Sequence, residues 1–460
     1  MATSRHPLAR FRPSPSFVLL AALLFVLWVA GGASRENVSG QIISRAAAWA
    51  SIILAVLFTR RPRIEEARGT ALLLLAAVIL CVVQLVPLPP DLWRALPGRA
   101  PFTDPIISPP DLWRPLSLVP GATLNALFSL VVPFAVLLLA TGIHEDQKRW
   151  LPATLLAVIA SSLVIGLIQV TGTRIANPLV NGTPGAIDGL IANRNHYALI
   201  LSFGLLIAPV WAFGYSGRSK NRAPIALGFV VLLVLTILAT GSRAGLVLGG
   251  LALALGLGFS RRGLKTAFQR YPRWVLPTVS VGLAAMLAIF VVASIAADRA
   301  VSIDRLVDQD AGQDMRGRGL PIVLAMIRTY FPFGTGMGSF DPIFRMHEPF
   351  TLLKPTYFNH AHNDFLEIVL NAGLPGLILL LVAIGWWGWK SLAAWRGDAA
   401  YVLPRLGSAM LLLILIASVT DYPARTPIIM AMATIAAIWL EGAVPATNGK
   451  GSLPLTERHL

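Results

Sequence analysis

Charged residues are scarce in this chain of 460 residues. Asp, Glu, Lys and Arg make up 13% of the sequence, whereas a soluble domain carries about 25%. Hydrophobic residues make up 55%, and apolar runs of about 20 residues, the length that crosses a bilayer as a helix, recur along the whole chain. This composition excludes an ordinary soluble protein and predicts that the lipid bilayer surrounds most of the chain.

Ionisable side chains are almost absent from the interiors of these apolar runs. An ion-coupled transporter needs carboxylates or cations near the bilayer midplane, so the sequence argues against a flippase or a secondary transporter, which stays the less favoured alternative. Only one cysteine is present, Cys81, inside an apolar run. It cannot form an intrachain disulfide and indicates nothing about the redox compartment.

The formal net charge of +16 raises the question of nucleic acid as a partner. The positive charges lie in short clusters between apolar runs, and no soluble segment has a basic face. Membrane topology explains such clusters better, so no nucleic acid is expected as a partner.

The hydropathy pattern predicts an all-α polytopic membrane protein of about 12 transmembrane helices. The chain then divides into spans one to nine (1–296), a large loop (297–364), spans ten to twelve (365–442) and a tail (443–460). The predicted spans are 16–33, 42–59, 70–88, 123–142, 150–170, 196–214, 224–241, 244–259, 274–296, 365–387, 403–419 and 427–441.

The distribution of charge fixes the predicted orientation. Of the 38 Lys and Arg, 22 fall on the two termini and on 60–68, 144–149, 215–223, 260–273 and 389–405, with only 7 of the 22 Asp and Glu. The formal charges of the two faces are therefore +15 and +1. Lys and Arg collect on the cytoplasmic side of membrane proteins, so both termini are predicted to be cytoplasmic.

Two loops on the opposite, outer face are long enough to have structure. The first, 89–122, is rich in proline and is predicted to be mostly extended or turn. The second, 297–364, is predicted to contain an amphipathic helix on the outer leaflet, because apolar residues recur there at helical spacing. These residues are Leu320, Val323, Leu324, Ile327 and Phe331.

Unusual polar residues collect at the outer ends of the predicted helices. Five separate segments bring Arg, His and Asn to this one face, a pattern that favours a site for an anionic, amphiphilic substrate. The segments are Asn193-Arg-Asn-His196, Thr240-Gly-Ser-Arg243, the pair Arg316 and Arg318, His360-Ala-His-Asn-Asp364, and Asp421-Tyr-Pro-Ala-Arg425.

Some of these residues also have a structural interpretation. Arg243 could anchor a turn at the lipid headgroups. Asp364 and Glu367 have the spacing of a capping box at the start of the tenth helix. The glycines of 334–338 lack a preceding strand and the spacing of a dinucleotide-binding loop, so a plain turn is predicted there.

His362-Asn363, followed after nine residues by Gly373-Leu-Pro-Gly376, resembles the His-Asn-x9-Gly-x-x-Gly signature of the O-antigen ligases. The stretch from Gly334 to Asp364 is similar to the domain that O-antigen ligases share with O-antigen polymerases. Arg316-Gly-Arg-Gly-Leu320 resembles the Arg-x3-Leu element of this family. The resemblance covers about residues 190–430, and its pieces occur in the expected order.

This resemblance implies a GT-C-like fold and a multi-pass protein of the bacterial inner membrane with one large periplasmic loop. The implied reaction moves a glycan from undecaprenyl diphosphate to an acceptor hydroxyl at the periplasmic face, with no metal or other cofactor. In a ligase the acceptor is the lipid A–core. In an O-antigen or exopolysaccharide polymerase, the alternative interpretation, it is another lipid-linked repeat unit.

Chemistry and resemblance together assign roles to the polar residues. The diphosphate leaving group needs a permanent positive charge with a planar set of donors, which arginine supplies. Arg243 and Arg316 are predicted to bind the diphosphate, with Arg318, Arg194 and Arg425 in reserve. His362 is the predicted general base, because histidine titrates near the operating pH. Asn363, His360 and Asp421 are predicted to support it.

The charge asymmetry makes a testable prediction about topology. Cysteines introduced near positions 310 and 455 should be labelled from opposite sides of the membrane, the first from the periplasm and the second from the cytoplasm. The measurement is labelling with a membrane-impermeant thiol reagent in intact and in permeabilised cells. Labelling of position 310 from the cytoplasmic side would overturn the orientation and the site that depends on it.

Overall fold

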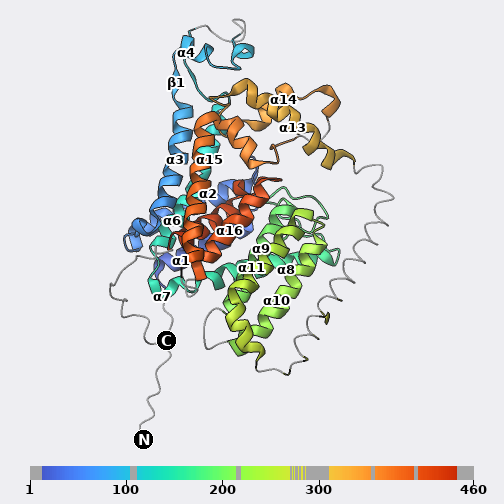
Figure 1. Ribbon diagram of the computed structural model, residues 1–460. Coiled ribbons are helices and arrows are strands. Elements are labelled where there is room, and N and C mark those ends of the chain that lie inside the picture. Colours follow the sequence, from blue (N-terminus) through green and yellow to red (C-terminus); the bar gives the residue numbers. More distant parts are fainter. Residues whose placement is uncertain are drawn as a thin grey trace.

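The computed structural model describes residues 13–103, 111–213, 219–269, 310–353, 358–397 and 402–442, and a few isolated residues between 272 and 285. The described part is almost entirely helical, as predicted (Figure 1). Eight helical segments in it are long and apolar enough to cross a membrane, and three shorter apolar helices accompany them. These segments match eleven of the twelve predicted spans. The ninth predicted span, 274–296, lies almost wholly outside the described residues.

The bounds of most helices follow the apolar runs closely. The fourth predicted span is divided at Leu130 into two helices, and the eighth and tenth spans continue about two turns beyond their predicted ends. The membrane helices are α1 (Pro15–Ala30), α2 (Ser39–Phe58), α3 (Arg68–Leu85), α5 (Pro120–Ser129), α6 (Val131–Thr141), α8 (Leu151–Val170), α9 (Arg194–Phe213), α10 (Ser219–Ala239), α11 (Arg243–Phe268), α15 (Asp364–Arg396), α16 (Val402–Ser418) and α17 (Pro427–Glu441).

Helix α9 forms the centre of the bundle and is buried over nearly its whole length. It packs closely against α11, where glycines replace larger side chains. A Cβ at Gly256 would lie 2.7 Å from the carbonyl oxygen of Leu206, and one at Gly245 would collide with Ala198. Small residues let helix backbones approach in this way inside membranes. The packing fixes the first residues of the two helices, Arg194 and Arg243, at the same end of the bundle.

The connecting segments predicted to be cytoplasmic meet at one end of the bundle. The backbone N–H of Ser14, before α1, donates to Gln147 in the short helix α7 (Glu145–Lys148) at 2.9 Å. Glu441, at the end of α17, accepts from the backbone N–H of Thr70 at 3.0 Å. Lys148 pairs with Glu66 of η1 (Ile64–Ala67) at 2.7 Å. The grouping agrees with the predicted topology, whereas the side of the membrane on which it lies remains a prediction.

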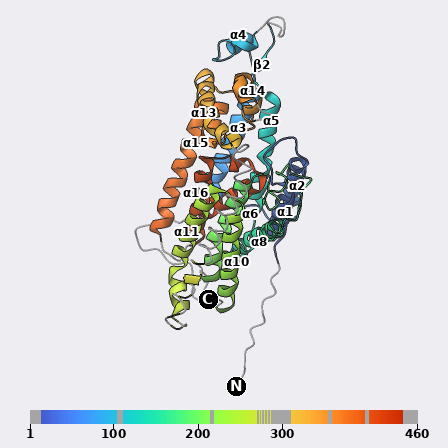
Figure 2. The same cartoon turned by 90° about the vertical axis from the view of Figure 1, so that its right-hand side faces the viewer.

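The large loop forms a layer over the opposite end of the bundle (Figures 1 and 2). It contains α13 (Asp310–Tyr330), α14 (Phe340–His347) and η3 (Phe350–Leu352). The amphipathic helix predicted here is α13, which buries Val323, Met326 and Tyr330 in an apolar cluster with α14. Leu320 and Leu324 remain exposed. The apolar face of α13 therefore serves partly to pack the loop itself.

The proline-rich loop after α3 contains only short elements, as predicted. They are the two-residue strands β1 (Pro87–Leu88) and β2 (Arg114–Pro115), the five-residue helix α4 (Pro90–Arg94) and η2 (Ala100–Phe102). Arg99 ties this loop to the large loop: it is almost completely buried and donates to the carbonyls of Leu116 at 2.6 Å and Gly334 at 3.3 Å. Burial lowers the pKa of Arg99 to about 10, although Tyr330 opposes the shift.

Helix α15 is interrupted at Gly373, whose φ of 57° and ψ of −141° are not helical. The glycine-rich turn of residues 332–338 fills the interruption. Its Gly336 N–H donates to the carbonyl of Asn371 at 2.8 Å, and the carbonyl of Pro332 accepts from Leu374 at 2.7 Å. These bonds satisfy backbone groups that the break would leave unpaired. The predicted plain turn is therefore correct, and the two glycines of the His-Asn signature mark this break in the helix.

Substituting Gly373 should destabilise the protein. A Cβ there would collide with the carbonyl of Pro332 in a backbone conformation that only glycine adopts easily. Gly373→Ala is expected to lower the free energy of unfolding by about 1–3 kcal/mol or more, measured as a lower Tm in detergent. Gly385→Ala is the matched control, because a Cβ on that glycine of the same helix meets nothing within 4 Å. Equal Tm values for the two variants would contradict this account of the signature.

Candidate active site

The predicted general base and a carboxylate meet at the end of the bundle that is predicted to face outward. His362 lies in the loop before α15, and Asp421 lies in the turn between α16 and α17. The Nδ1 of His362 is 3.4 Å from Oδ1 of Asp421. The backbone of His362 has a φ of 50°, a left-handed conformation that costs about 1–3 kcal/mol in a residue other than glycine. Such strain is typical of functional sites, where the surrounding structure imposes it.

Asn363 fixes the loop that carries His362. Its side chain caps α15 by accepting from the N–H of Leu366 at 3.0 Å, and its Nδ2 donates to the carbonyl of Val419 at 3.0 Å. The capping box predicted from Asp364 and Glu367 is therefore wrong, because Asn363 is the cap and Glu367 accepts from the N–H of Ala361 at 2.8 Å. Asn363 also joins the loop before α15 to the end of α16.

Asp421 is the most heavily contacted carboxylate of the site. It is 3% exposed, and it accepts from the side-chain amides of Asn195 at 2.7 Å and Asn193 at 3.1 Å and from the N–H of Tyr422 at 3.0 Å. Burial opposes its ionisation, but His196 and His362 hold the pKa of Asp421 well below its ordinary value. Asp421 is therefore ionised.

An ionised Asp421 beside His362 favours the tautomer of the imidazole with its proton on Nδ1. That tautomer leaves Nε2 able to accept a proton. The side chain of His362 is 18% exposed, and its buried Nδ1 contacts Asp421 at 3.4 Å without forming a hydrogen bond among the described residues. This arrangement suits a general base.

Tyr422 packs among three histidines. The ring centroids of His360, His362 and His196 lie 4.1, 5.0 and 5.2 Å from that of Tyr422. Burial and the neighbouring Asp421 raise its pKa to about 12, so it stays a neutral phenol. Sequence reasoning did not assign Tyr422 a role, although it lies inside one of the five polar segments.

Arg425, a predicted reserve for diphosphate binding, lies in the short helix η4 (Pro423–Arg425) between two buried carboxylates. Its Nε is 2.9 Å from Asp364 Oδ1, and its Nη1 is 3.1 Å from Glu367 Oε1. Burial opposes the charge of Arg425, but Glu367 and Asp364 raise its pKa above the ordinary value. Glu367 also contacts His360 Nδ1 at 3.0 Å. Arg425 and His360 therefore belong to one buried ionic cluster.

The other predicted arginines with described side chains are Arg194, Arg243 and Arg318. Arg194 and Arg243 are exposed at the first residues of α9 and α11. They lie beside the site, because Ser242 Oγ donates to Asn195 Oδ1 at 2.7 Å. Arg318 donates to the carbonyl of Thr351 at 3.0 Å. The side chain of Arg316 lies outside the described residues, although nearby Gly319 lies against Phe358, whose ring is 5.1 Å from that of His362.

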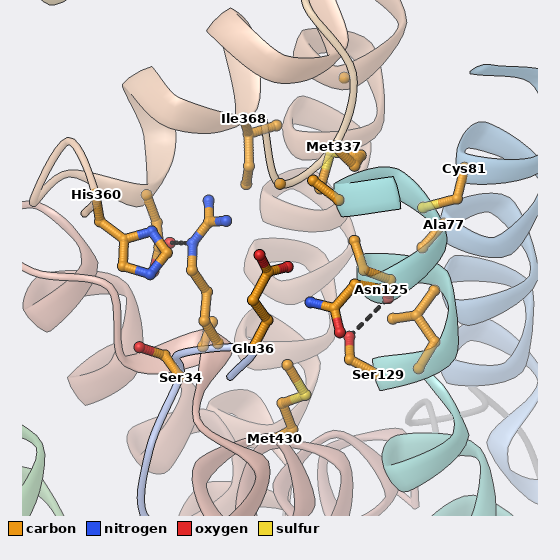
Figure 3. A pocket seen from close by; sticks show the side chains of 18 of the residues that line it. Ser34, Glu36, Ala77, Cys81, Asn125, Ser129, Met337, His360, Ile368 and Met430 are labelled. Carbon is orange, nitrogen blue, oxygen red and sulfur yellow. Dashed lines mark hydrogen bonds and ion pairs between the residues drawn. The ribbon is translucent and has the colours of Figure 1, made fainter. Parts of the chain in front are cut away.

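A pocket of about 900 Å³ opens beside this site, between α2, α3, α5, α14, α15 and η4 (Figure 3). His360, Asp364 and Arg425 line it, whereas His362 does not. Three further arginines that sequence reasoning missed also line the pocket: Arg35, Arg45 and Arg345. One signal was available, because Arg45 interrupts a predicted apolar span. In the described ranges no group of three or more His, Cys, Asp or Glu could hold a metal ion.

The helices and this site define a polytopic membrane protein with a polar centre at one end of its helical bundle. Residues 228–381 match the family described as O-antigen ligase. The match confirms the predicted resemblance: over these residues the chain is similar to the O-antigen ligase family. No curated protein matches the chain. The matched segment covers one third of the chain and contains Arg243, Arg316, Arg318, His360, His362 and Asn363, whereas Arg194, Asp421 and Arg425 lie outside it.

The ionic cluster predicts that Arg425 stabilises the folded protein. Arg425→Ala would leave Asp364 and Glu367 buried without a counter-charge, which should destabilise the protein by about 3–5 kcal/mol. We expect low abundance in the membrane and a lower Tm. Arg243→Ala is the control, since it removes the same charge from an exposed helix start. Should Arg425→Ala be as abundant and as stable as Arg243→Ala, the role in ligand binding predicted from the sequence would be favoured instead.

Proposed function

We propose that the protein transfers a glycan from undecaprenyl diphosphate to an acceptor hydroxyl at the periplasmic face of the bacterial inner membrane. The match of residues 228–381 to the O-antigen ligase family supports a reaction of the ligase or polymerase type. The observation that carries the proposal is the contact between His362 and Asp421, 3.4 Å apart and surrounded by asparagine, tyrosine and arginine side chains.

In the proposed reaction His362 activates the acceptor. Its Nε2 takes the proton of the acceptor hydroxyl while the hydroxyl oxygen attacks the anomeric carbon of the donor sugar. Asp421 keeps the imidazole in the required tautomer and stabilises the positive charge that develops on it. The new glycosidic bond forms on the face opposite to the breaking bond, so the anomeric configuration inverts.

The leaving group is the lipid diphosphate, which gains negative charge as the bond between its oxygen and the sugar breaks. Arg243 and Arg316 are proposed to neutralise that charge, with Arg194 and Arg318 nearby. The exposure of Arg194 and Arg243 supports this role, because both guanidinium groups can be reached from the outer leaflet. No metal ion is required for this chemistry, since the permanent charge of arginine does the neutralising.

The identity of the acceptor distinguishes a ligase from a polymerase. We favour the lipid A–core, which makes the protein a ligase, and the alternative is a lipid-linked repeat unit, which makes it a polymerase. Deletion followed by analysis of lipopolysaccharide separates them. Loss of all polymer from the lipid A–core with polymer accumulating on the carrier identifies a ligase, whereas single repeat units on the core identify a polymerase.

The proposal predicts that His362→Ala slows transfer by about 10²–10⁴-fold, the usual contribution of a general base, while the donor still binds. The measurement is transfer by purified, reconstituted protein given the same lipid-linked donor and acceptor. His347→Ala is the matched control: His347 bonds the carbonyl of Ile343 in α14 at 2.9 Å, away from Asp421. His360 is less suitable because it contacts Glu367. If His362→Ala retains more than roughly a tenth of the control rate, His362 is not a general base of this kind.

A further inference from the structure

The pocket beside the active site is lined by both charged and apolar side chains. Four arginines line it, Arg35, Arg45, Arg345 and Arg425. Its walls come from membrane helices, with Leu73, Ala77 and Leu80 on α3 and Leu379, Leu380 and Ala383 on α15. In Figure 3 the labelled Ala77 and Cys81 lie on one side of the pocket and His360 on the other. Such a division matches a ligand with an anionic head and a hydrocarbon chain.

Two of the four arginines already have carboxylate partners. Arg345 makes a bidentate pair with Asp341, at 2.8 and 2.9 Å, and Arg425 is held by Asp364 and Glu367. Two of the three carboxylates that line the pocket, Asp341 and Asp364, are therefore paired with arginines, and the third, Glu36, is exposed. The remaining pocket arginines, Arg35 and Arg45, both come from the first hairpin of the chain.

Arg45 is the unusual member of this group. It lies six residues into α2, or about 9 Å along the helix axis, where an ionisable side chain in a membrane helix is costly and by default indicates function. Its Nη2 donates to Gln41 at a long 3.4 Å, and its Nε is buried without a hydrogen-bond partner among the described residues. Glu36 lies near enough to act on its charge but forms no ion pair with it. The guanidinium of Arg45 therefore retains donors for a ligand.

The pocket is distinct from the proposed diphosphate site. Among the described residues, none from α9, α10 or α11 lines it, whereas Arg194 and Arg243 belong to α9 and α11. Between the two arginine groups lie Tyr422 and the three histidines that pack on it. The candidate base thus has an arginine-bearing binding surface on each side.

We propose that this pocket is a second lipid site, which binds the phosphate or diphosphate of a membrane-embedded lipid at Arg45, with the lipid chain between α3, α5 and α15. Two lipid chemistries carry such a head: an isoprenoid diphosphate and a phosphorylated acyl lipid such as lipid A. The assignment of the bound lipid as the acceptor substrate rests on the proposed function. Binding itself does not, because it depends only on the pocket.

The test counts lipids bound to the purified full-length protein by native mass spectrometry. The probes, titrated separately, are geranylgeranyl diphosphate and lipid A, and the controls are geranylgeraniol and inorganic diphosphate. We expect Arg45→Ala to weaken binding of one lipid by about 10–100-fold, the effect of losing a hydrogen bond to a charged group. Ala77→Trp, which fills the apolar part without changing charge, should weaken it too. Arg328→Ala, an exposed arginine of α13 outside the pocket, should not.

The result separates this inference from the proposed function. Arg243→Ala should leave the lipid that depends on Arg45 in place, and it reports on the proposed diphosphate site alone. Whichever probe depends on both Arg45 and Ala77 identifies the lipid class. The second site is refuted if Arg45→Ala and Ala77→Trp both bind like Arg328→Ala. It is equally refuted if geranylgeraniol binds as tightly as geranylgeranyl diphosphate, or if inorganic diphosphate alone binds as tightly as either lipid.

Discussion

The end of the bundle that carries the candidate site is organised around one buried carboxylate. An ionised Asp421 that is 3% exposed must have its charge compensated inside the protein. Its partners come from the start of α9, the loop before α15 and the turn between α16 and α17. These segments are far apart in the sequence. The hydrogen bonds and contacts of Asp421 join them, and through His362 they also help to orient the candidate base.

The same turn carries a second charge cluster. Four residues after Asp421, Arg425 binds Asp364 and Glu367 of α15. Two sets of interactions therefore fix the start of α15: the ion pairs of Arg425 and the helix cap that Asn363 provides. The break at Gly373 then allows the large loop to bond to the same helix. A buried centre fixed in this way contrasts with Arg194 and Arg243, which are exposed at the starts of α9 and α11.

Apolar runs were sufficient to predict the helices, because a bilayer of constant thickness requires spans of nearly constant length. They were less informative about the ends of α11 and α15, which continue past the apolar core into Arg261 and Arg262 and into Arg396. The polar segments were also predicted to share one face, since topology alone places them there. Their pairing could not be predicted. No local rule links Asn195 to Asp421 or Arg425 to Glu367. The predicted cap, Asp364, differs from the observed cap, Asn363, by one residue, which lies within the usual uncertainty of helix ends. Arg45 was missed because counting charges by segment conceals a single arginine inside an apolar span.

The proposed reaction between two lipid-anchored molecules would impose a geometric requirement that this arrangement meets. Both proposed substrates would be confined to the plane of one leaflet, so each would approach the candidate base laterally rather than from the water. Helices α9 and α11 present Arg194 and Arg243 on one side of the Tyr422 cluster, while α2, α3 and α15 enclose the pocket on the other. Because His360 lines the pocket and contacts Tyr422, which in turn contacts His362, a lipid head in the pocket is separated from the base by these two rings. In the proposed reaction the phosphate of such a lipid would therefore lie away from the anomeric carbon, where an additional negative charge would oppose the departure of the diphosphate.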